Sequence, residues 1–244
     1  MSYIFGRKPI IESLRSGTTI SKIFLQFGTH GIEIEEIKQL AKSKSVIVSE
    51  IDKFKCDQIA GGELTQGVIA QISEKKISSV DEIISSAKNK NENPFILIFD
   101  EIEDPHNLGA LIRSGVCFGA HGGILPKHHS ATITPTVVKT SAGAIEHFTV
   151  AQVTNIAQEI EKLKKENIWV VGTDSNAEKN FTEIDFTCPI AIVIGNEGKG
   201  MRRLVKEKCD FLVKIPMTKK FDSLNVSVAG AIVMSEVFRQ RNKK

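Results

Sequence analysis

The chain has 244 residues, of which 41% are hydrophobic and 25% are charged, and its formal net charge is +3. This is the composition of a soluble globular protein with room for one large domain or two small ones. No stretch approaches about 18 uninterrupted apolar residues, so we expect no membrane span. The N-terminus lacks the apolar segment of a signal peptide, and the four cysteines are isolated in sequence, without a CxxC motif or zinc knuckle. We therefore expect a cytoplasmic protein.

Residues 1–73 are predicted to form a small α/β domain. Short apolar runs at residues 20–27, 45–48 and 66–72 are typical of strands. Between the first two runs, residues 32–43 carry apolar side chains at helical spacing, which predicts a helix with one buried face.

The composition changes over residues 74–93, which are rich in serine, lysine and asparagine. These residue types are typical of an exposed connecting segment. We therefore predict a linker at residues 74–93, with at most one short helix around residues 80–87, and place the domain boundary there.

Residues 94–244 are predicted to form a second α/β domain around a mostly parallel sheet. Continuous apolar runs at residues 95–99, 168–172 and 189–194 suit strands that are buried on both faces. Helical patterns lie between these runs, and the last helix is predicted over residues 225–240. Ligands of such sheets bind where the strands end.

Three polar loops lie in or near such places. The first, residues 100–114, leads from a buried strand into a helix that Asp104 or Asn107 is suited to cap. Arg113 falls within two turns of Asn107. Taken alone, this segment is equally well explained as a capped helix with one solvated arginine.

The second loop, residues 194–201, directly follows a predicted strand and contains three glycines within six residues. Such a run indicates a tight turn or a backbone that a ligand approaches closely. It is not a phosphate-binding Walker A loop, because Met201 and Arg202 stand where lysine and serine or threonine are needed. Nucleotide hydrolysis is therefore excluded. A buried Glu197 would be costly without partners, which favours a functional role for this residue.

The third loop comprises residues 215–217 and 221–229, where Ser223 or Asn225 is suited to cap the last helix. Between the second and third loops, residues 199–220 carry eight basic and two acidic side chains. Such a run is usually a solvated surface, but next to ligand loops it is equally compatible with a polyanionic partner.

Together, the three loops resemble the signature motifs of the SpoU (TrmH-like) branch of SPOUT RNA 2′-O-methyltransferases. The matching segments are residues 104–110 with Arg113, residues 195–200 and residues 223–229, in the order of the family. The resemblance covers residues 94–244. It extends more loosely to residues 1–73, which are similar to the L30e-like substrate-binding domain of the family.

The resemblance implies a deep trefoil knot near the C-terminus, a homodimer formed through the knotted domain, and S-adenosylmethionine as methyl donor. It is strongest to the bacterial enzymes that methylate the ribose of a guanosine in 23S rRNA. The tRNA enzymes of the branch usually lack the N-terminal domain, so its presence favours ribosomal RNA as the partner.

The resemblance also implies roles for individual residues. Arg113 is the central catalytic residue, and in a dimer it serves the cofactor of the other protomer. A guanidinium rarely deprotonates, so phosphate binding and stabilisation of the developing alkoxide suit it better than a role as base. Asn107 orients the ribose or Arg113, Glu197 holds its loop, and Ser223 and Asn225 complete a hydrogen-bond cluster. The implied cofactor-binding residues are Gly195, Asn196, Gly198, Gly200, Ile215, Met217 and Leu224.

Two alternatives remain open from the sequence. The same chemistry could act on tRNA, or the chain could be a non-catalytic RNA-binding protein of ribosome assembly. The intact motif residues argue against the second alternative. His106 is more readily explained by loop support or RNA contact than by catalysis. The adjacent His128 and His129 have no nearby carboxylate, so we expect no metal site.

Overall fold

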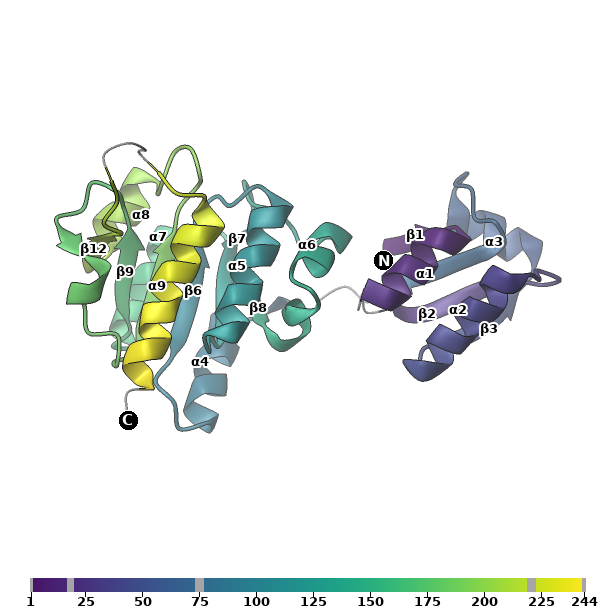
Figure 1. The fold of residues 1–244 in the computed structure, drawn as a ribbon, viewed down its shortest axis with the longest axis horizontal. Coiled ribbons are helices and arrows are strands. Elements are labelled where there is room, and N and C mark those ends of the chain that lie inside the picture. Colours follow the sequence, from purple (N-terminus) through teal and green to yellow (C-terminus); the bar gives the residue numbers. More distant parts are fainter. Residues whose placement is uncertain (1, 17–19, 73–76, 219–222, 243–244) are drawn as a thin grey trace. The chain divides into compact units, whose positions relative to one another are not determined.

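The structure is a computed structural model that describes residues 2–16, 20–72, 77–218 and 223–242. The chain divides into two compact units, residues 1–75 (unit 1) and residues 76–244 (unit 2) (Figure 1).

Unit 1 is built on a four-stranded sheet with the strand order β1-β4-β2-β3. Strands β2 and β3 pair in parallel, and the other pairs are antiparallel. Apolar side chains of α1 and α2 pack on one face of this sheet, and α3 covers the other face through Cys56. The elements are β1 (Ser2–Phe5), α1 (Arg7–Ser16), β2 (Ile20–Gln26), α2 (Ile32–Ser43), β3 (Ile47–Ile51), α3 (Lys53–Ala60) and β4 (Val68–Ile72).

Most of the predicted elements of unit 1 are confirmed. The helix over residues 32–43 has the predicted bounds, and the first and last predicted strands are β2 and β4. The strand predicted at residues 45–48 is displaced to β3. The reason is local, because Ser45 has a φ of 56° and the backbone N–H of Val46 donates to Ala41. Residues 45 and 46 therefore complete the turn that ends α2.

Unit 2 is built on an eight-stranded sheet with the order β10-β12-β9-β11-β6-β7-β8-β5. Every pair of neighbouring strands is parallel, which confirms the predicted fold class. The strands are β5 (Ile77–Ser78), β6 (Phe95–Phe99), β7 (Gly122–Pro126), β8 (Thr149–Val153), β9 (Trp169–Thr173), β10 (Lys179–Asn180), β11 (Ile190–Ile194) and β12 (Phe211–Lys214).

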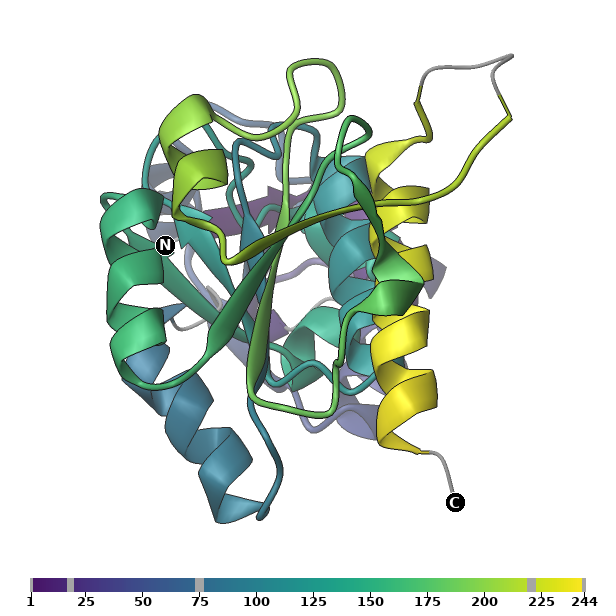
Figure 2. The same ribbon diagram turned by 90° about the vertical axis from the view of Figure 1, so that its left-hand side faces the viewer.

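Helices cover both faces of this sheet. Figure 2 shows α5 and α9 on one side and α4, α7 and α8 on the other, and each side has its own apolar core. All five side chains of β6 and of β11 are buried, as expected for central strands of a parallel sheet. The helices are α4 (Val80–Asn89), α5 (Pro105–Cys117), α6 (Pro135–Thr140), α7 (Ile156–Lys165), α8 (Arg203–Lys208) and α9 (Val226–Arg241), with short 3-10 turns at Ala144–His147 and Phe181–Glu183.

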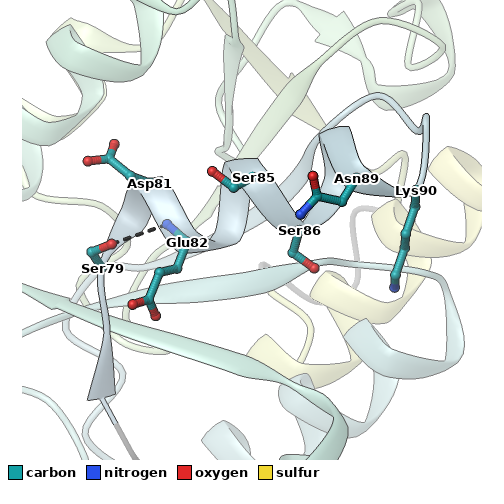
Figure 3. Close-up of a pocket in the computed structure, with 7 residues that line it drawn as sticks. All are labelled: Ser79, Asp81, Glu82, Ser85, Ser86, Asn89 and Lys90. Atoms are coloured by element: carbon teal, nitrogen blue, oxygen red, sulfur yellow. Dashed lines mark hydrogen bonds between the residues drawn. The ribbon is translucent and has the colours of Figure 1, made fainter.

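The predicted linker at residues 74–93 requires a correction, because much of it belongs to unit 2. Strand β5 pairs with β8, and helix α4 buries Ile83 and Ile84 in the core it shares with β7 and β8. The polar residues that suggested a linker lie on the solvent side of this amphipathic helix. They line a shallow depression of about 540 Å³ (Figure 3): Ser79, Asp81, Glu82, Ser85, Ser86, Asn89 and Lys90.

The carboxyl ends of β6, β9, β11 and β12 meet at one edge of the sheet, where the predicted loops begin. Among the described residues, no helix combines the length and apolar character that a membrane crossing requires. The trefoil knot stays a prediction, and residues 219–222 of the third loop lie outside the described residues.

Candidate active site

A pocket of about 530 Å³ lies at the carboxyl edge of the unit 2 sheet. Its walls come from the ends of β9, β11 and β12 and from the start of α9. All of the residues that the sequence analysis assigned to cofactor binding line this pocket: Gly195, Asn196, Gly198, Gly200, Ile215, Met217 and Leu224. Glu197 and Ser223 line it as well, and both are exposed, so the cost of burial considered for Glu197 does not apply.

The loop that follows β11, residues 195–202 (the glycine loop), is folded onto itself. The backbone N–H and C=O groups of Asn196 and Gly200 bond to one another at 3.0 and 2.9 Å. The side-chain oxygen of Asn196 also accepts the N–H groups of Gly198 and Lys199. A Cβ at Gly195 would lie 2.4 Å from the backbone nitrogen of Met201. Glycine is therefore required at position 195 by the loop itself, before any ligand is considered.

We expect Gly195→Ala to lower the free energy of unfolding by about 1–3 kcal/mol, because the new methyl group meets backbone atoms that cannot move aside cheaply. Gly198→Ala is the matched control. The nearest atom to its Cβ would be 3.8 Å away, so its unfolding free energy should change by less than about 0.5 kcal/mol. Denaturant unfolding of the ligand-free proteins measures both values. Equal stability of the two variants would contradict this account of Gly195.

Three polar side chains from the three loops form a closed hydrogen-bonded cluster. Asn107 donates through Nδ2 to Oε2 of Glu197 at 3.0 Å, and Asn225 donates through Nδ2 to the other carboxylate oxygen at 2.8 Å. Asn225 Nδ2 also lies 3.1 Å from Oδ1 of Asn107. The Oδ1 atom of Asn225 caps α9 by accepting the N–H groups of Ser227 and Val228. The cluster thus ties the starts of α5 and α9 to the glycine loop.

The structure does not bring Arg113 into this cluster. Asn107 is buried, whereas Arg113 is exposed further along α5 and makes no hydrogen bond or ion pair with any described residue. Six residues of a helix correspond to about 1.7 turns, so the two side chains leave α5 on different sides. Ser223 lies at the pocket but likewise has no hydrogen bond to the part of the chain that is described.

One wall of the pocket, formed by residues 173–176 at the end of β9, was not predicted from the sequence. Here Lys206 pairs with Asp174 at 2.5 Å, and the carboxylate also accepts the N–H of Asn176. Burial alone would raise the pKa of Asp174, but these hydrogen bonds outweigh burial and hold its pKa below the usual range. The position at the end of an apolar run in a parallel sheet was the signal that could have indicated this loop.

Four of the eight basic side chains in residues 199–220 form ion pairs within the fold. Lys219 and Lys220 lie outside the described residues, and Lys199 and Lys214 have no ion pair with a described residue. The other four are paired: Arg202 with Asp100, Arg203 with Glu207, Lys206 with Asp174 and Lys208 with Glu161. Much of the charge excess in this run is therefore balanced by acidic residues from elsewhere in the chain.

The remaining polar candidates lie apart from the cluster. His106 is exposed, with its Nδ1 atom 3.4 Å from the hydroxyl of Thr140, and His128 and His129 are exposed. Within the described ranges, no group of three or more His, Cys, Asp or Glu side chains is placed to hold a metal ion.

Two family models match the chain. Residues 94–235 match the model described as SpoU rRNA Methylase family, and residues 3–78 match the model described as RNA 2′-O ribose methyltransferase substrate binding. The putative TrmH family tRNA/rRNA methyltransferase YacO of Bacillus subtilis is 45% identical over 240 residues, which are 98% of this chain and 96% of that protein. A putative TrmH family tRNA/rRNA methyltransferase of Staphylococcus saprophyticus is 44% identical over 239 residues, with the same coverage.

Solved structures share the fold. The crystal structure of the SpoU methyltransferase AviRb from Streptomyces viridochromogenes has a TM-score of 0.68 at 24% identity, covering 98% of this chain and 89% of that chain. The same enzyme in complex with the cofactor AdoMet has a TM-score of 0.68 at 23% identity, covering 98% and 90%. The A. aeolicus TrmH/SpoU tRNA modifying enzyme has a TM-score of 0.57 at 28% identity, covering 66% and 83%.

Proposed function

Because the chain belongs to the SpoU rRNA Methylase family and is thus an RNA methyltransferase, we propose that it methylates the ribose 2′-hydroxyl of a guanosine in 23S rRNA, with S-adenosylmethionine as methyl donor. The presence of unit 1 is the observation that favours ribosomal RNA as the substrate. It matches a substrate-binding model of ribose methyltransferases over residues 3–78 and has its own sheet and core. The same reaction on tRNA is the second candidate, since the relatives are named tRNA/rRNA methyltransferases.

The pocket suits S-adenosylmethionine in size and in chemistry. Its volume of about 530 Å³ lies within the range of roughly 300–1,000 Å³ that is typical of small-molecule sites. Apolar Ile215, Met217 and Leu224 suit the adenine ring, and the glycine loop offers backbone groups at close range. S-adenosylmethionine supplies a methyl group on a positively charged sulfur. AviRb, which shares the fold, was solved with this cofactor.

The chain's own residues position the reactants. Both carboxylate oxygens of Glu197 accept amide N–H groups, so this side chain organises Asn107 and Asn225 rather than standing free as a base. Ser223 lines the pocket and has no hydrogen bond to a described residue, so its hydroxyl is available to contact the substrate. Alignment of the ribose oxygen with the methyl group is the main contribution expected from such a site.

We assign Arg113 to the pocket of a second protomer. It is exposed and unpaired among the described residues, and it lies outside the pocket of its own chain. In a homodimer built through unit 2, each guanidinium would bind a phosphate beside the target ribose and stabilise the negative charge on the attacking oxygen.

The free cysteines suit the reducing cytoplasm, where ribosomal RNA is made.

Methyl transfer from labelled S-adenosylmethionine tests the proposal on two separate pools of unmodified RNA, 23S rRNA and bulk tRNA. The expected result is label in 23S rRNA together with one internucleotide bond that resists alkaline hydrolysis, because its 2′-hydroxyl carries the methyl group. Label in tRNA alone would overturn the ribosomal substrate and keep the reaction. Absence of label in either pool, and in precursor ribosomal particles, would favour the non-catalytic RNA-binding alternative.

Within unit 1, we expect RNA at the end of the sheet where the β1–α1 connection and the segment before β4 meet. A depression of about 590 Å³ lies there, lined by Arg7, Lys8 and Leu64 among others. Arg7 is held in place by hydrogen bonds to Gln66, whereas Lys8 is exposed and Leu64 is 79% exposed. A cation beside an exposed apolar side chain suits a phosphate and an unpaired base.

The variants Lys8→Ala and Leu64→Ala should each weaken RNA binding by roughly three- to tenfold, and Lys8→Ala should also reduce its salt dependence. Lys44→Ala and Ile47→Ala are the matched controls, since both residues lie at the opposite end of the same sheet and Ile47 is 64% exposed. Filter binding over a range of salt concentrations measures the effect. Equal losses in the controls would move the RNA surface elsewhere.

A further inference from the structure

A buried carboxylate stands directly behind the glycine loop. Asp100 follows β6, its side chain is 0% exposed, and its backbone N–H donates to Ile194 at the end of β11. Oδ2 of Asp100 accepts the backbone N–H of Arg202 at 2.8 Å. Oδ1 accepts Nε of the same arginine at 2.7 Å and forms an ion pair with its Nη2 at 2.6 Å. An arginine that meets a carboxylate through several bonds has a strongly defined geometry.

The next residue holds the other end of the loop. The backbone oxygen of Glu101 accepts Nδ2 of Asn196 at 2.9 Å, and Glu101 adopts a φ of 60° to present it. Two consecutive residues after β6 thus fix the glycine loop at Asn196 and at Arg202. The Glu101 carboxylate also lies 3.5 Å from Nε of Arg202, and Glu197 of the glycine loop reaches Asn107 in the first turn of α5.

We propose that Asp100 and Arg202 are positioning residues that hold the glycine loop in its ligand-binding shape before the cofactor arrives. The inference rests on the proposed function, in which this loop binds S-adenosylmethionine. A loop that is already ordered loses less conformational freedom on binding, so the affinity for the ligand is higher. Asp100 is fully buried and Arg202 is 41% exposed, and a pair that buries a charge is often no more stabilising than apolar residues of the same volume, so the geometry that the pair imposes is the better explanation of its presence.

The chain contains a comparable ion pair whose residues do not line the pocket. Asp210, just before β12, accepts the backbone N–H of Val170 at 2.9 Å and pairs with Lys164 at 2.7 Å. Like Asp100, Asp210 accepts a backbone N–H and pairs with a basic side chain. It lies at the amino-terminal edge of the unit 2 sheet, whereas the glycine loop lies at the carboxyl edge. Asp210→Asn therefore reports what the loss of such a pair does to the fold alone.

The test compares Asp100→Asn and Arg202→Lys with Asp210→Asn by hydrogen exchange and by calorimetry. Without cofactor, the amides of Gly198, Lys199 and Gly200 should exchange at least about tenfold faster in the two Asp100–Arg202 variants than in the wild type. The Kd for S-adenosylmethionine should rise about tenfold, and the loss in methyl transfer should lie in KM for the cofactor more than in kcat. Asp210→Asn should lower the unfolding midpoint without either change.

Arg202→Lys keeps the positive charge on a side chain that is 41% exposed, so this variant should fold even if Asp100→Asn does not. Loop exchange and cofactor Kd within twofold of wild type in a folded variant would overturn the proposal, as would equal effects in Asp210→Asn. If the wild-type protein bound no S-adenosylmethionine, the proposed function would fail. Loop exchange in the cofactor-free protein would still decide whether Asp100 and Arg202 hold the loop.

Discussion

Mixing two inactive variants, Arg113→Ala and Glu197→Gln, should restore methyl transfer to about a quarter of the wild-type rate. In the homodimer proposed above, random exchange of protomers would place about half of the dimers in the mixed form, and each mixed dimer would have one complete site. That site combines the intact pocket of the Arg113→Ala protomer with the intact arginine of the other. The expectation follows from the exposed position of Arg113 outside its own pocket.

Two controls define this result. Glu197→Gln mixed with Asn225→Ala should stay inactive, because both changes damage the same protomer's cluster. Arg113→Ala alone should bind S-adenosylmethionine with nearly the wild-type Kd, since Arg113 does not line the pocket. No activity after mixing, in dimers verified by sedimentation, would show that Arg113 serves its own chain.

Glu197→Gln alone should reduce kcat by about a hundredfold or more, the scale observed when one preorganised polar group of an active site is lost. The reason is the pattern of donors. Both carboxylate oxygens accept N–H groups, from Asn107 and from Asn225. A glutamine must turn its own NH₂ group towards one of these donors, so the cluster opens and α5 and α9 lose their common anchor. Single-turnover methyl transfer measures the effect.

Glu207→Gln is the matched control for this change. Glu207 lies in α8, close in sequence to the glycine loop, and is exposed like Glu197, but among the described residues it pairs only with Arg203. Exposed pairs of this kind contribute little, so its kcat should stay within about twofold of wild type. A fall in kcat of similar size in both variants would mean that net charge near the pocket, rather than the cluster, is responsible.

The sequence was sufficient to predict which loops meet. Runs such as residues 95–99 and 189–194 indicated buried parallel strands, and the carboxyl ends of such strands share one edge. The cluster of Asn107, Glu197 and Asn225 and the cofactor residues were implied by the resemblance to the family, and the structure places the cluster beside a pocket that those cofactor residues line. The family predicted from these loops is confirmed.

Other features depend on which residues meet in space and could not be predicted from local patterns. The basic run at residues 199–220 was counted against its own acidic neighbours, whereas its partners Asp100, Glu161 and Asp174 come from other parts of the chain. The short helix predicted around residues 80–87 is confirmed as α4, but the polar residues around it concealed that its buried side chains attach it to the core of unit 2. The separation of Arg113 from Asn107, in contrast, was predictable, because six residues of a helix correspond to about 1.7 turns.

The attachment of β5 and α4 to unit 2 also determines where this chain can be divided. A fragment that began at Pro94, where the match to the methylase model begins, would remove β5 and leave β8 as a bare sheet edge. It would also strip the cover from Ile124 and Ala151, which lie in the core with α4. Open edges and uncovered apolar surface promote aggregation. Separate expression of the methyltransferase unit should therefore start no later than Ile77, so that the cut falls in the segment that joins the two cores.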